Sequence, residues 1–294
     1  MRAVRAARPA SANAARRSFG ALAAVAARAL EPISPTPRLE AELLLAHAAG
    51  VSRTEVIAFP QREPSGEAEA RFRAALARRS DGEPLAYIRG YKDFHDVSLR
   101  VTPDVLIPRP ETECVVEEAL ARIGVRTDCA VLDLGTGSGA IALAIRRARP
   151  AAAVTAVDAS PAALAVARSN AELLGLDIRC LESRWFAGLA AARFDLIVCN
   201  PPYVRSGDRC LDGALRFEPR QSLDGGSDGL DAIRAVLSGA PPHLGAGGLL
   251  LIEHGHDQRA RVVTLAGERG YETLATRRDL SGLARLVVLR RAPA

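Results

Sequence analysis

Hydrophobic positions follow two different patterns along the chain, and the change between them divides it into two parts. Over residues 1–82 the apolar positions recur at helical spacing in the stretches 36–49, 52–60 and 65–79. The expected inner positions of two of these helices are Leu39, Leu43, Ala46, Ala68, Phe72, Ala75 and Leu76. Because proline, glycine and capping residues separate the stretches, we expect a small all-α helical bundle, with residues 1–20 loosely attached.

Residues 83–107 show the alternation of apolar and polar positions that is typical of strands. The pair His95-Asp96 interrupts this alternation and indicates a turn, so we expect a β-hairpin that links the bundle to the rest of the chain. The apolar positions of this hairpin are Phe94, Val97, Leu99 and Val101.

The segment after the hairpin, Pro108–Glu113, contains two prolines and should form a stiff loop. A helix is expected from about residue 111 to residue 123, with acidic residues in its first turn where the helix dipole favours them. Ordinary entry into this helix explains the loop. A stiff loop would also place Arg109 and Glu111 as one wall of a pocket.

Within residues 108–294, short apolar runs alternate with amphipathic stretches, as in a doubly wound α/β domain. Strands are expected near residues 130–134, 154–157, 178–181, 196–199, 249–253, 271–276 and 286–289. Helices are expected near residues 139–149, 161–174, 230–240 and 258–269. The loop at 279–282 is too short to join parallel strands, so the last two strands should pair antiparallel in a mixed seven-stranded sheet.

Composition narrows the class of protein. With 294 residues, of which 48% are hydrophobic and 25% charged, the chain can bury one large core and one small one. The net charge is +5, but Lys92 is the only lysine, so the arginine excess indicates a coding bias and not a nucleic-acid patch. We expect no stable nucleic-acid binding, and no apolar run reaches the length of a membrane span.

Residues 1–30 contain arginine, alanine and serine but no acidic residue before Glu31, which is also the composition of a mitochondrial transit peptide. We favour a loose start that leads into the first helix of the bundle. The five cysteines are widely spaced, which indicates a reducing compartment and no zinc site. The expected location is therefore the cytoplasm, with the mitochondrion as the alternative.

A glycine-rich turn follows the first predicted strand of the α/β domain. Its residues are Gly135, Thr136, Gly137, Ser138 and Gly139. Glycine is needed where the backbone turns tightly and where a ligand comes closer than a Cβ atom would allow. The next strand ends about twenty residues later at Asp158, where a carboxylate can accept hydrogen bonds from both hydroxyls of a ribose. Together the two features predict a nucleoside site.

Another strand, residues 194–199, is followed directly by Asn200, Pro201, Pro202 and Tyr203. Prolines cannot continue a sheet ladder, so this tetrapeptide lies at the carboxyl end of the strand, where open α/β sheets bind ligands. An amide, two carbonyl groups and an aromatic ring could converge there on a small planar group. A Pro-Pro turn with a capping Asn explains the tetrapeptide alone equally well.

The two motifs together resemble a class I S-adenosylmethionine-dependent methyltransferase, a Rossmann-like fold. Within that superfamily the chain is similar to the PrmC/HemK family, the glutamine-N5 methyltransferases of peptide chain release factors. The similarity rests on Glu83–Gly90, Pro108–Glu113, Asp133–Gly139, Asn200–Tyr203, Phe217–Pro219, Leu223–Gly226, Asp228–Leu230, Glu253 with Gln258, and Asp279-Leu280.

The resemblance implies a domain of residues 108–294 that binds S-adenosylmethionine through the glycine turn and Asp158 and releases S-adenosylhomocysteine. It implies that Asn200 and the Pro201 carbonyl accept hydrogen bonds from a glutamine amide while Tyr203 stacks on it, with no metal. Trp185 is expected beside the adenine, although Arg184 replaces the acidic residue usual before it. Class I release factors would be the substrates of a monomer. The helical bundle is too small to be the catalytic body, so we expect it to recognise the substrate, although a role as a stabilising cap explains it equally well.

Three rival interpretations remain open at this point. A paralogous enzyme methylates a glutamine of a ribosomal protein. The Asn-Pro-Pro-Tyr motif also suits the exocyclic amine of DNA adenine or ribosomal RNA. A non-catalytic S-adenosylmethionine-binding adaptor is the interpretation from a different class. The histidines His254 and His256 could share a strand face like a metal pair, but a solvated strand end explains them better.

Overall fold

The structure, a computed structural model, describes residues 17–124, 128–213 and 215–292. The chain forms two compact units, and the division lies between Arg89 and Gly90. Most of the segment that was expected to be loose, residues 1–16, lies outside the described residues. No helix in the described part of the chain is long and apolar enough to cross a membrane.

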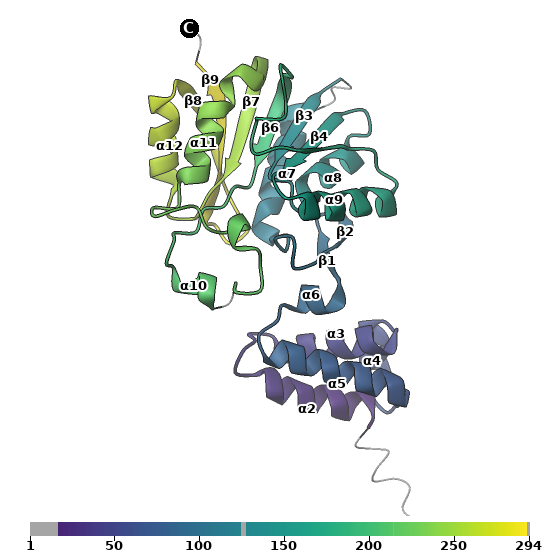
Figure 1. Cartoon of the computed structure of the whole chain (residues 1–294). Coiled ribbons are helices and arrows are strands. Elements are labelled where there is room, and N and C mark those ends of the chain that lie inside the picture. Colours follow the sequence, from purple (N-terminus) through teal and green to yellow (C-terminus); the bar gives the residue numbers. More distant parts are fainter. Residues whose placement is uncertain (1–16, 125–127, 214, 293–294) are drawn as a thin grey trace, which may run out of the picture. The chain divides into compact units, whose positions relative to one another are not determined.

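The first unit is the predicted helical bundle. Its helices are α2 (Phe19–Leu30), α3 (Pro37–Ala49), α4 (Arg53–Ala58), α5 (Gly66–Ser80) and α6 (Leu85–Arg89) (Figure 1). Helix α3 contacts all four of the others, so it is the centre of the bundle. A capping box is present at the start of α4, where Ser52 and Glu55 satisfy each other's backbone amides.

One detail of the bundle differs from the prediction. Leu39 was expected on the inner face of α3, yet it is 37% exposed, whereas Leu44 and Leu45 are fully buried. The reason is that neighbours surround α3, so the buried face depends on their positions and not on one apolar stripe. Part of the Arg-rich start, Phe19–Leu30, forms α2 and buries Phe19 and other apolar residues in the bundle core.

The second unit contains the predicted mixed sheet of seven strands. The strands are β3 (Ala130–Leu134), β4 (Ala153–Asp158), β5 (Arg179–Glu182), β6 (Phe194–Cys199), β7 (Leu244–Glu253), β8 (Tyr271–Arg278) and β9 (Ala284–Arg291). Their order is β5-β4-β3-β6-β7-β9-β8. The first five are parallel, and β9 pairs antiparallel with both β7 and β8, as the short loop between the last two strands required.

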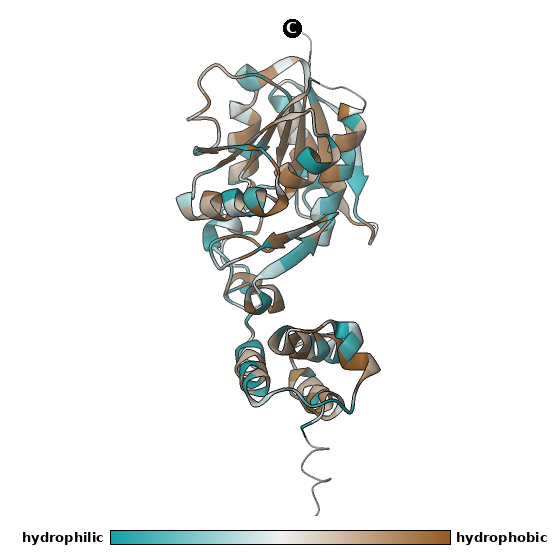
Figure 2. Ribbon diagram, turned by 90° about the vertical axis from the view of Figure 1, so that its right-hand side faces the viewer, coloured by the Kyte–Doolittle hydropathy of each residue, from teal (hydrophilic) through white to brown (hydrophobic). Residues whose placement is uncertain are grey.

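Apolar side chains cover both faces of the sheet, because successive strand residues point to opposite sides. On β3, Val131 belongs to one core cluster and Leu132 to the other. The first cluster includes residues of α7 (Glu113–Ile123), α8 (Ala140–Ala148) and α9 (Pro161–Leu174). The second includes residues of α11 (Asp231–Gly239) and α12 (Arg259–Glu268). Figure 2 shows the central strands mainly in the hydrophobic colour, as expected for strands buried on both faces.

The stretch that was expected to be a hairpin linker, residues 83–107, has two parts. Residues 85–89 form α6 in the first unit, whereas β1 (Tyr91–Phe94) and β2 (Val97–Arg100) form the predicted antiparallel hairpin in the second unit. This hairpin is not a free connection, since β2 packs on α8 and α9 and Phe94 is buried in the first core cluster.

Candidate active site

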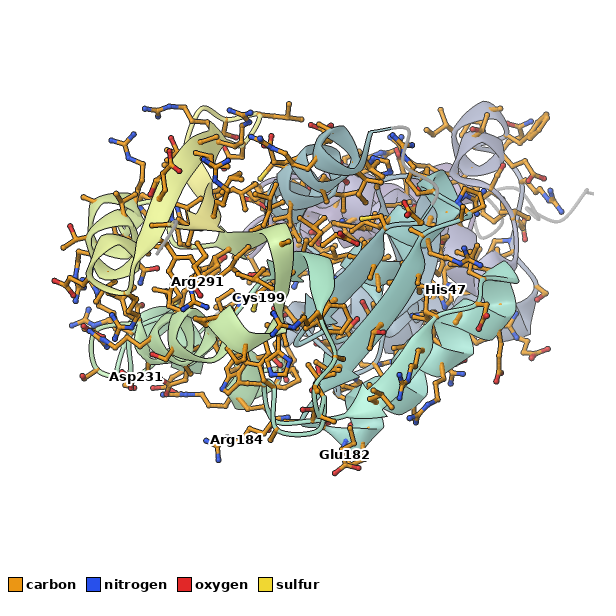
Figure 3. The ribbon with its side chains drawn as sticks, turned by 90° about the horizontal axis from the view of Figure 1, so that it is seen from above. His47, Glu182, Arg184, Cys199, Asp231 and Arg291 are labelled. Atoms are coloured by element: carbon orange, nitrogen blue, oxygen red, sulfur yellow. The ribbon has the colours of Figure 1, made fainter. Side chains whose placement is uncertain are left out.

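The candidate site lies at the carboxyl ends of four adjacent parallel strands. Leu134, the last residue of β3, is in register with Val157 on one side and Cys199 on the other. Cys199 is in turn in register with Ile252 of β7. Asp158, the glycine turn, Asn200 and Glu253 therefore follow one another along the same edge of the sheet. Figure 3 labels Cys199 within the sheet, directly before the Asn200 to Tyr203 motif.

The backbone of the glycine turn is left-handed at three positions. Gly135, Gly137 and Gly139 have φ angles of 72°, 55° and 85°, which L side chains rarely adopt. An added Cβ atom would meet no heavy atom within 4 Å at Gly135 or Gly137, so these two positions border open space. The amide of Gly137 donates to Asp158 Oδ2 at 2.9 Å. The two predicted halves of the nucleoside site are thus in direct contact.

Two other residues of the turn face the protein interior. The Thr136 hydroxyl donates to Asp133 Oδ2 at 2.7 Å, and Ser138 is buried, with its carbonyl accepting from Asn170 at 2.8 Å. Asp133 itself is buried, and burial raises the pKa of its carboxyl group to about 7. The Thr136 side chain therefore holds the turn against Asp133, and its amide donates to the Val157 carbonyl at 2.9 Å.

The side chains of the Asn200 to Tyr203 motif are held from three directions. Asn200 Nδ2 donates to Thr112 Oγ1 at 3.1 Å. The Tyr203 hydroxyl donates to Glu253 Oε1 at 3.3 Å, and the Tyr203 carbonyl accepts from Gln258 Nε2 at 2.9 Å. Pro201 is buried, whereas Asn200, Pro202 and Tyr203 are partly exposed. The motif is therefore a braced surface and not a free Pro-Pro turn.

The loop from residue 107 to residue 113 contacts the motif through Thr112. Buried Glu218 holds this loop: its Oε2 accepts from the Ile107 amide at 3.0 Å, and its Oε1 is paired with Arg109. Thr112, at the end of the loop, then contacts Asn200. The ion pair and the hydrogen bond set the distance between the loop and the strand ends.

Glu253, the last residue of β7, is fully buried at this site. Burial raises its pKa to about 7, although hydrogen bonds from Thr112 and Tyr203 and the charge of Arg285 lower it. The pKa of the Tyr203 phenol is also raised, mainly by burial, so this hydroxyl stays protonated as a donor. The Glu253 carboxyl group therefore lies beside a tyrosine hydroxyl that stays neutral.

Trp185 lies beyond β5, at the outer end of the same edge. Its φ angle is 53°, and its carbonyl accepts from Ser183 Oγ at 2.8 Å. The indole is partly buried against the second core cluster. Neighbouring Arg184 is exposed, and Figure 3 shows its side chain directed away from the body of the unit. Arg184 therefore lies on the surface and does not cover Trp185 from the core side.

The interpretation of the two histidines as a solvated strand end is wrong for one of them. His256 is exposed, but His254 is fully buried and hydrogen-bonded through Nδ1 to the Gly255 carbonyl. Its amide donates to the Arg285 carbonyl, which ties the end of β7 to β9. Within the described residues, no group of three histidine, cysteine or carboxylate side chains could hold a metal ion.

The geometry suits the binding of a planar NH₂ group beside a nucleoside. Asn200 Oδ1 and the Pro201 carbonyl are acceptors that need no ionisation, and Tyr203 supplies an aromatic face. No sequence pattern singled out Thr112, Glu218 or Gln258 as site residues. Glu218, Glu253 and Gln258 stood out in the sequence only as residues that resemble those of the PrmC/HemK family, without a role. Their roles depend on contacts across 50 or more residues, for which a single sequence carries no signal.

Comparison with known proteins agrees with this geometry. The family model described as PrmC N-terminal domain matches residues 21–90, and that described as Methyltransferase small domain matches residues 117–217. A release factor glutamine methyltransferase from Burkholderia pseudomallei is 48% identical over 261 residues, which cover 86% of this chain and 91% of the relative. One from Pseudomonas aeruginosa is also 48% identical and covers 87% of this chain and 94% of the relative.

The fold has a counterpart among solved structures. A crystal structure of a methyltransferase from Pyrococcus furiosus matches with a TM-score of 0.52 at 18% identity. It covers 75% of this chain and 99% of that chain. At this level of identity the likeness shows a shared methyltransferase fold.

Proposed function

Because the chain belongs to the family of release factor glutamine methyltransferases, we propose that it methylates the side-chain amide nitrogen (N5) of a glutamine in peptide chain release factors, within their Gly-Gly-Gln motif. The observation that carries this proposal is the braced Asn200 to Tyr203 motif, adjacent to a glycine turn that contacts Asp158. The names of the two relatives described above favour this substrate over a ribosomal protein or a nucleic-acid base.

The cofactor site fits S-adenosylmethionine. The backbone of Gly135 and Gly137 borders open space, which permits close approach of a ligand. Asp158 Oδ1 and Oδ2 each accept one backbone amide, from Ser160 and Gly137, so the carboxylate keeps lone pairs for ribose hydroxyls. Trp185 would contact the adenine. When bound, the cofactor supplies a methyl group on a positively charged sulfur, which is ready for nucleophilic attack.

The protein's contribution to the transfer is orientation. An amide nitrogen is a poor nucleophile because its lone pair is delocalised into the carbonyl group. Asn200 Oδ1 and the Pro201 carbonyl would accept its two N–H bonds, and the Tyr203 ring would fix the amide plane. Placing two reactants in line can give effective molarities of about 10⁵ M or more. The reaction exchanges one N–H for N–CH₃ and releases S-adenosylhomocysteine and one proton, so no strong base is required.

The test is methyl transfer from labelled S-adenosylmethionine to a recombinant release factor. We expect label on the Gly-Gly-Gln glutamine, and a loss of about 100-fold or more in kcat for Asn200→Ala. A release factor in which this glutamine is replaced by alanine controls for labelling elsewhere, and a ribosomal protein tests the rival substrate. Label on the ribosomal protein and none on the release factor would overturn the proposal.

The helical unit is proposed to contribute to recognition of the protein substrate, and the enzyme to act as a monomer in the cytoplasm. The match of residues 21–90 to the N-terminal domain of the same family supports the proposal for the helical unit. In the assay above, a short peptide that contains Gly-Gly-Gln should show a much higher KM than the full-length release factor. Equal KM values would contradict a role of contacts beyond the motif.

A further inference from the structure

On the basis of the proposed function, we infer that Glu253 is a positioning residue: through Thr112 it sets which end of the Asn200 amide faces the substrate, and it holds the ring of Tyr203. Glu253 does not touch the expected position of the reacting atoms. It acts through Tyr203, which would contact the substrate amide, and through Thr112, which holds Asn200.

The contacts run in one chain. Glu253 lies at the end of β7 with no exposed surface, directly beside the strand that carries the motif. Its Oε1 accepts from the Tyr203 hydroxyl at 3.3 Å, and Thr112 hydrogen-bonds to the same carboxyl group. The Thr112 oxygen in turn accepts from Asn200 Nδ2 at 3.1 Å. Residues from three separate segments, at positions 112, 200–203 and 253, thus share one buried network.

The direction of these hydrogen bonds follows from the chemistry of each group. A threonine hydroxyl carries one hydrogen and can accept as well as donate. If Thr112 donates its only hydrogen to Glu253, it can offer Asn200 only an acceptor. Asn200 must then present Nδ2 to Thr112 and leave Oδ1 to face the opening. A glutamine substrate needs an acceptor at that point for its own NH₂ group.

Protonation of Glu253 does not reverse the direction of these hydrogen bonds. Its Oε2 is buried and has no hydrogen-bond partner among the described residues, so a proton on Oε2 leaves Oε1 as an acceptor. The other titratable or charged groups around the carboxyl are Tyr203, Arg285, Glu111, Cys114 and Cys199. Of these, only Tyr203 forms a hydrogen bond to it. The network therefore needs an acceptor at Oε1 and not a negative charge.

This requirement separates two substitutions of the same residue. In Glu253→Gln the side-chain carbonyl can take the place of Oε1, and the NH₂ group takes the place of the unpartnered Oε2. In Glu253→Leu no acceptor remains, so Thr112 is free to donate to Asn200 Oδ1. The Asn200 amide then turns over and presents two hydrogens to a substrate that also presents hydrogens.

The experiment measures kcat and KM for methylation of full-length release factor, together with the Kd for S-adenosylmethionine by calorimetry. We expect Glu253→Leu to lower kcat about 100-fold, with the cofactor Kd within about 3-fold of the wild type. Glu253→Gln should keep kcat within about 5-fold. Thr112→Val, which removes the hydroxyl at nearly constant volume, should reproduce the loss even if Glu253→Leu folds poorly.

A matched control is Glu118→Leu. Glu118 is also buried, and it pairs with Arg122 and Arg277 on the outside of the first core cluster. This variant should be less stable but keep its kcat. The double variant Glu253→Leu with Thr112→Val should lose no more than the worse single variant, because both interrupt one chain.

If the wild type is active, any of three results would overturn the inference. The first is a folded Glu253→Leu or Thr112→Val variant with kcat within 3-fold of the wild type. The second is a Glu253→Gln variant as impaired as Glu253→Leu, and the third is a double variant in which the two losses of kcat multiply. Failure of the wild type to label the release factor would instead contradict the proposed function, and the positioning role with it.

Discussion

Single residues outside the Asn200 to Tyr203 motif determine its shape. Gln258 is the clearest case, because its side chain donates to the carbonyls of Tyr203 and Gly229 and accepts from the Gly255 amide. Gly229 completes this contact. A Cβ atom there would lie 2.5 Å from the Tyr203 carbonyl oxygen and 2.6 Å from Gln258 Nε2. Only glycine permits so close an approach.

The substitution Gly229→Ala is therefore expected to damage both the fold and the activity. The left-handed φ angle of 75° costs an alanine about 1 kcal/mol, and displacement of the Tyr203 carbonyl adds about 1–3 kcal/mol. Because the motif moves with this carbonyl, kcat should fall at least 10-fold. Chemical denaturation and the methyl-transfer assay measure the two effects.

Gly270→Ala is the matched control for this change. Gly270 has the same φ angle of 75°, but no heavy atom lies within 4 Å of its added Cβ. It should lose about 1 kcal/mol of unfolding free energy and retain full activity. Equal losses in the two variants would mean that backbone strain alone explains the effect, and that the contact with Tyr203 is unimportant.

Among the elements, the β1–β2 hairpin is joined to the glycine turn by one side chain of α9. Asn170 is buried, and its Oδ1 accepts from the Arg100 amide at 2.7 Å. Its Nδ2 donates to the Arg100 carbonyl at 3.0 Å and to the Ser138 carbonyl at 2.8 Å. The hairpin and the glycine turn are therefore fixed to the same point of one helix.

Asn170→Ala should loosen both elements together. Three backbone groups lose their partner, and because such groups cost about 1–3 kcal/mol each when left unpaired and buried, we expect a loss of about 3 kcal/mol in unfolding free energy after relaxation. Hydrogen exchange of the Arg100 amide should accelerate, and the affinity for S-adenosylmethionine should fall a few-fold. Exchange of the β3 and β4 amides is the internal control. Unchanged protection at Arg100 would contradict this role of Asn170.

At the scale of the whole molecule, two of the buried carboxyl groups of the second unit have pKa values far above their ordinary ones. Burial raises the pKa values of Asp133 and Glu253 to about 7 each, above their ordinary values of 3.8 and 4.5. Between these ordinary values and about pH 7, the folded protein keeps protons that the unfolded chain has lost. Each group therefore lowers the unfolding free energy as the pH rises through this window, by up to about 1.4 kcal/mol per pH unit.

Glu253→Gln isolates one of these contributions, because the glutamine cannot ionise. Relative to the wild type, the variant should gain about 3 kcal/mol in unfolding free energy between pH 4.5 and pH 8. Denaturant titrations at four or five pH values measure the difference. Glu272→Gln, in an exposed pair with Arg290, should differ by less than about 1 kcal/mol throughout. A constant difference for Glu253→Gln across this range would contradict a raised pKa.

Local sequence patterns were sufficient for most elements. The apolar run of β6 and the two prolines after it located the strand and its end, since proline removes the donor that a ladder needs. The short loop at 279–282 determined the antiparallel pairing of β9 before any contact was known. The glycines of the turn indicated a tight turn of the backbone, and all three have positive φ angles. Each of these features depends on steric and hydrogen-bonding rules that act within a few residues.

Where the pattern was weak, the prediction was wrong or incomplete. Leu39 was expected on the inner face of its helix but is exposed. His254 was expected at a solvated strand end but is buried. Helix α6 was missed within the expected hairpin linker. In all three cases the outcome depends on which elements pack against the residue. The periodicity of apolar residues in the sequence does not specify which elements will be neighbours.

The sequence by itself determined the two parts of the chain, the positions of the strands along it, the antiparallel pairing of the last two, the glycine turn with Asp158, and the place of Asn200 at a strand end. Only the tertiary structure decided which side chains hold the candidate site. Thr112 reaches Asn200 across 88 residues, Gln258 reaches Tyr203 across 55, and Glu253 reaches Tyr203 across 50. Such contacts arise when separate segments pack in one register, so no short-range rule of the chain can specify them.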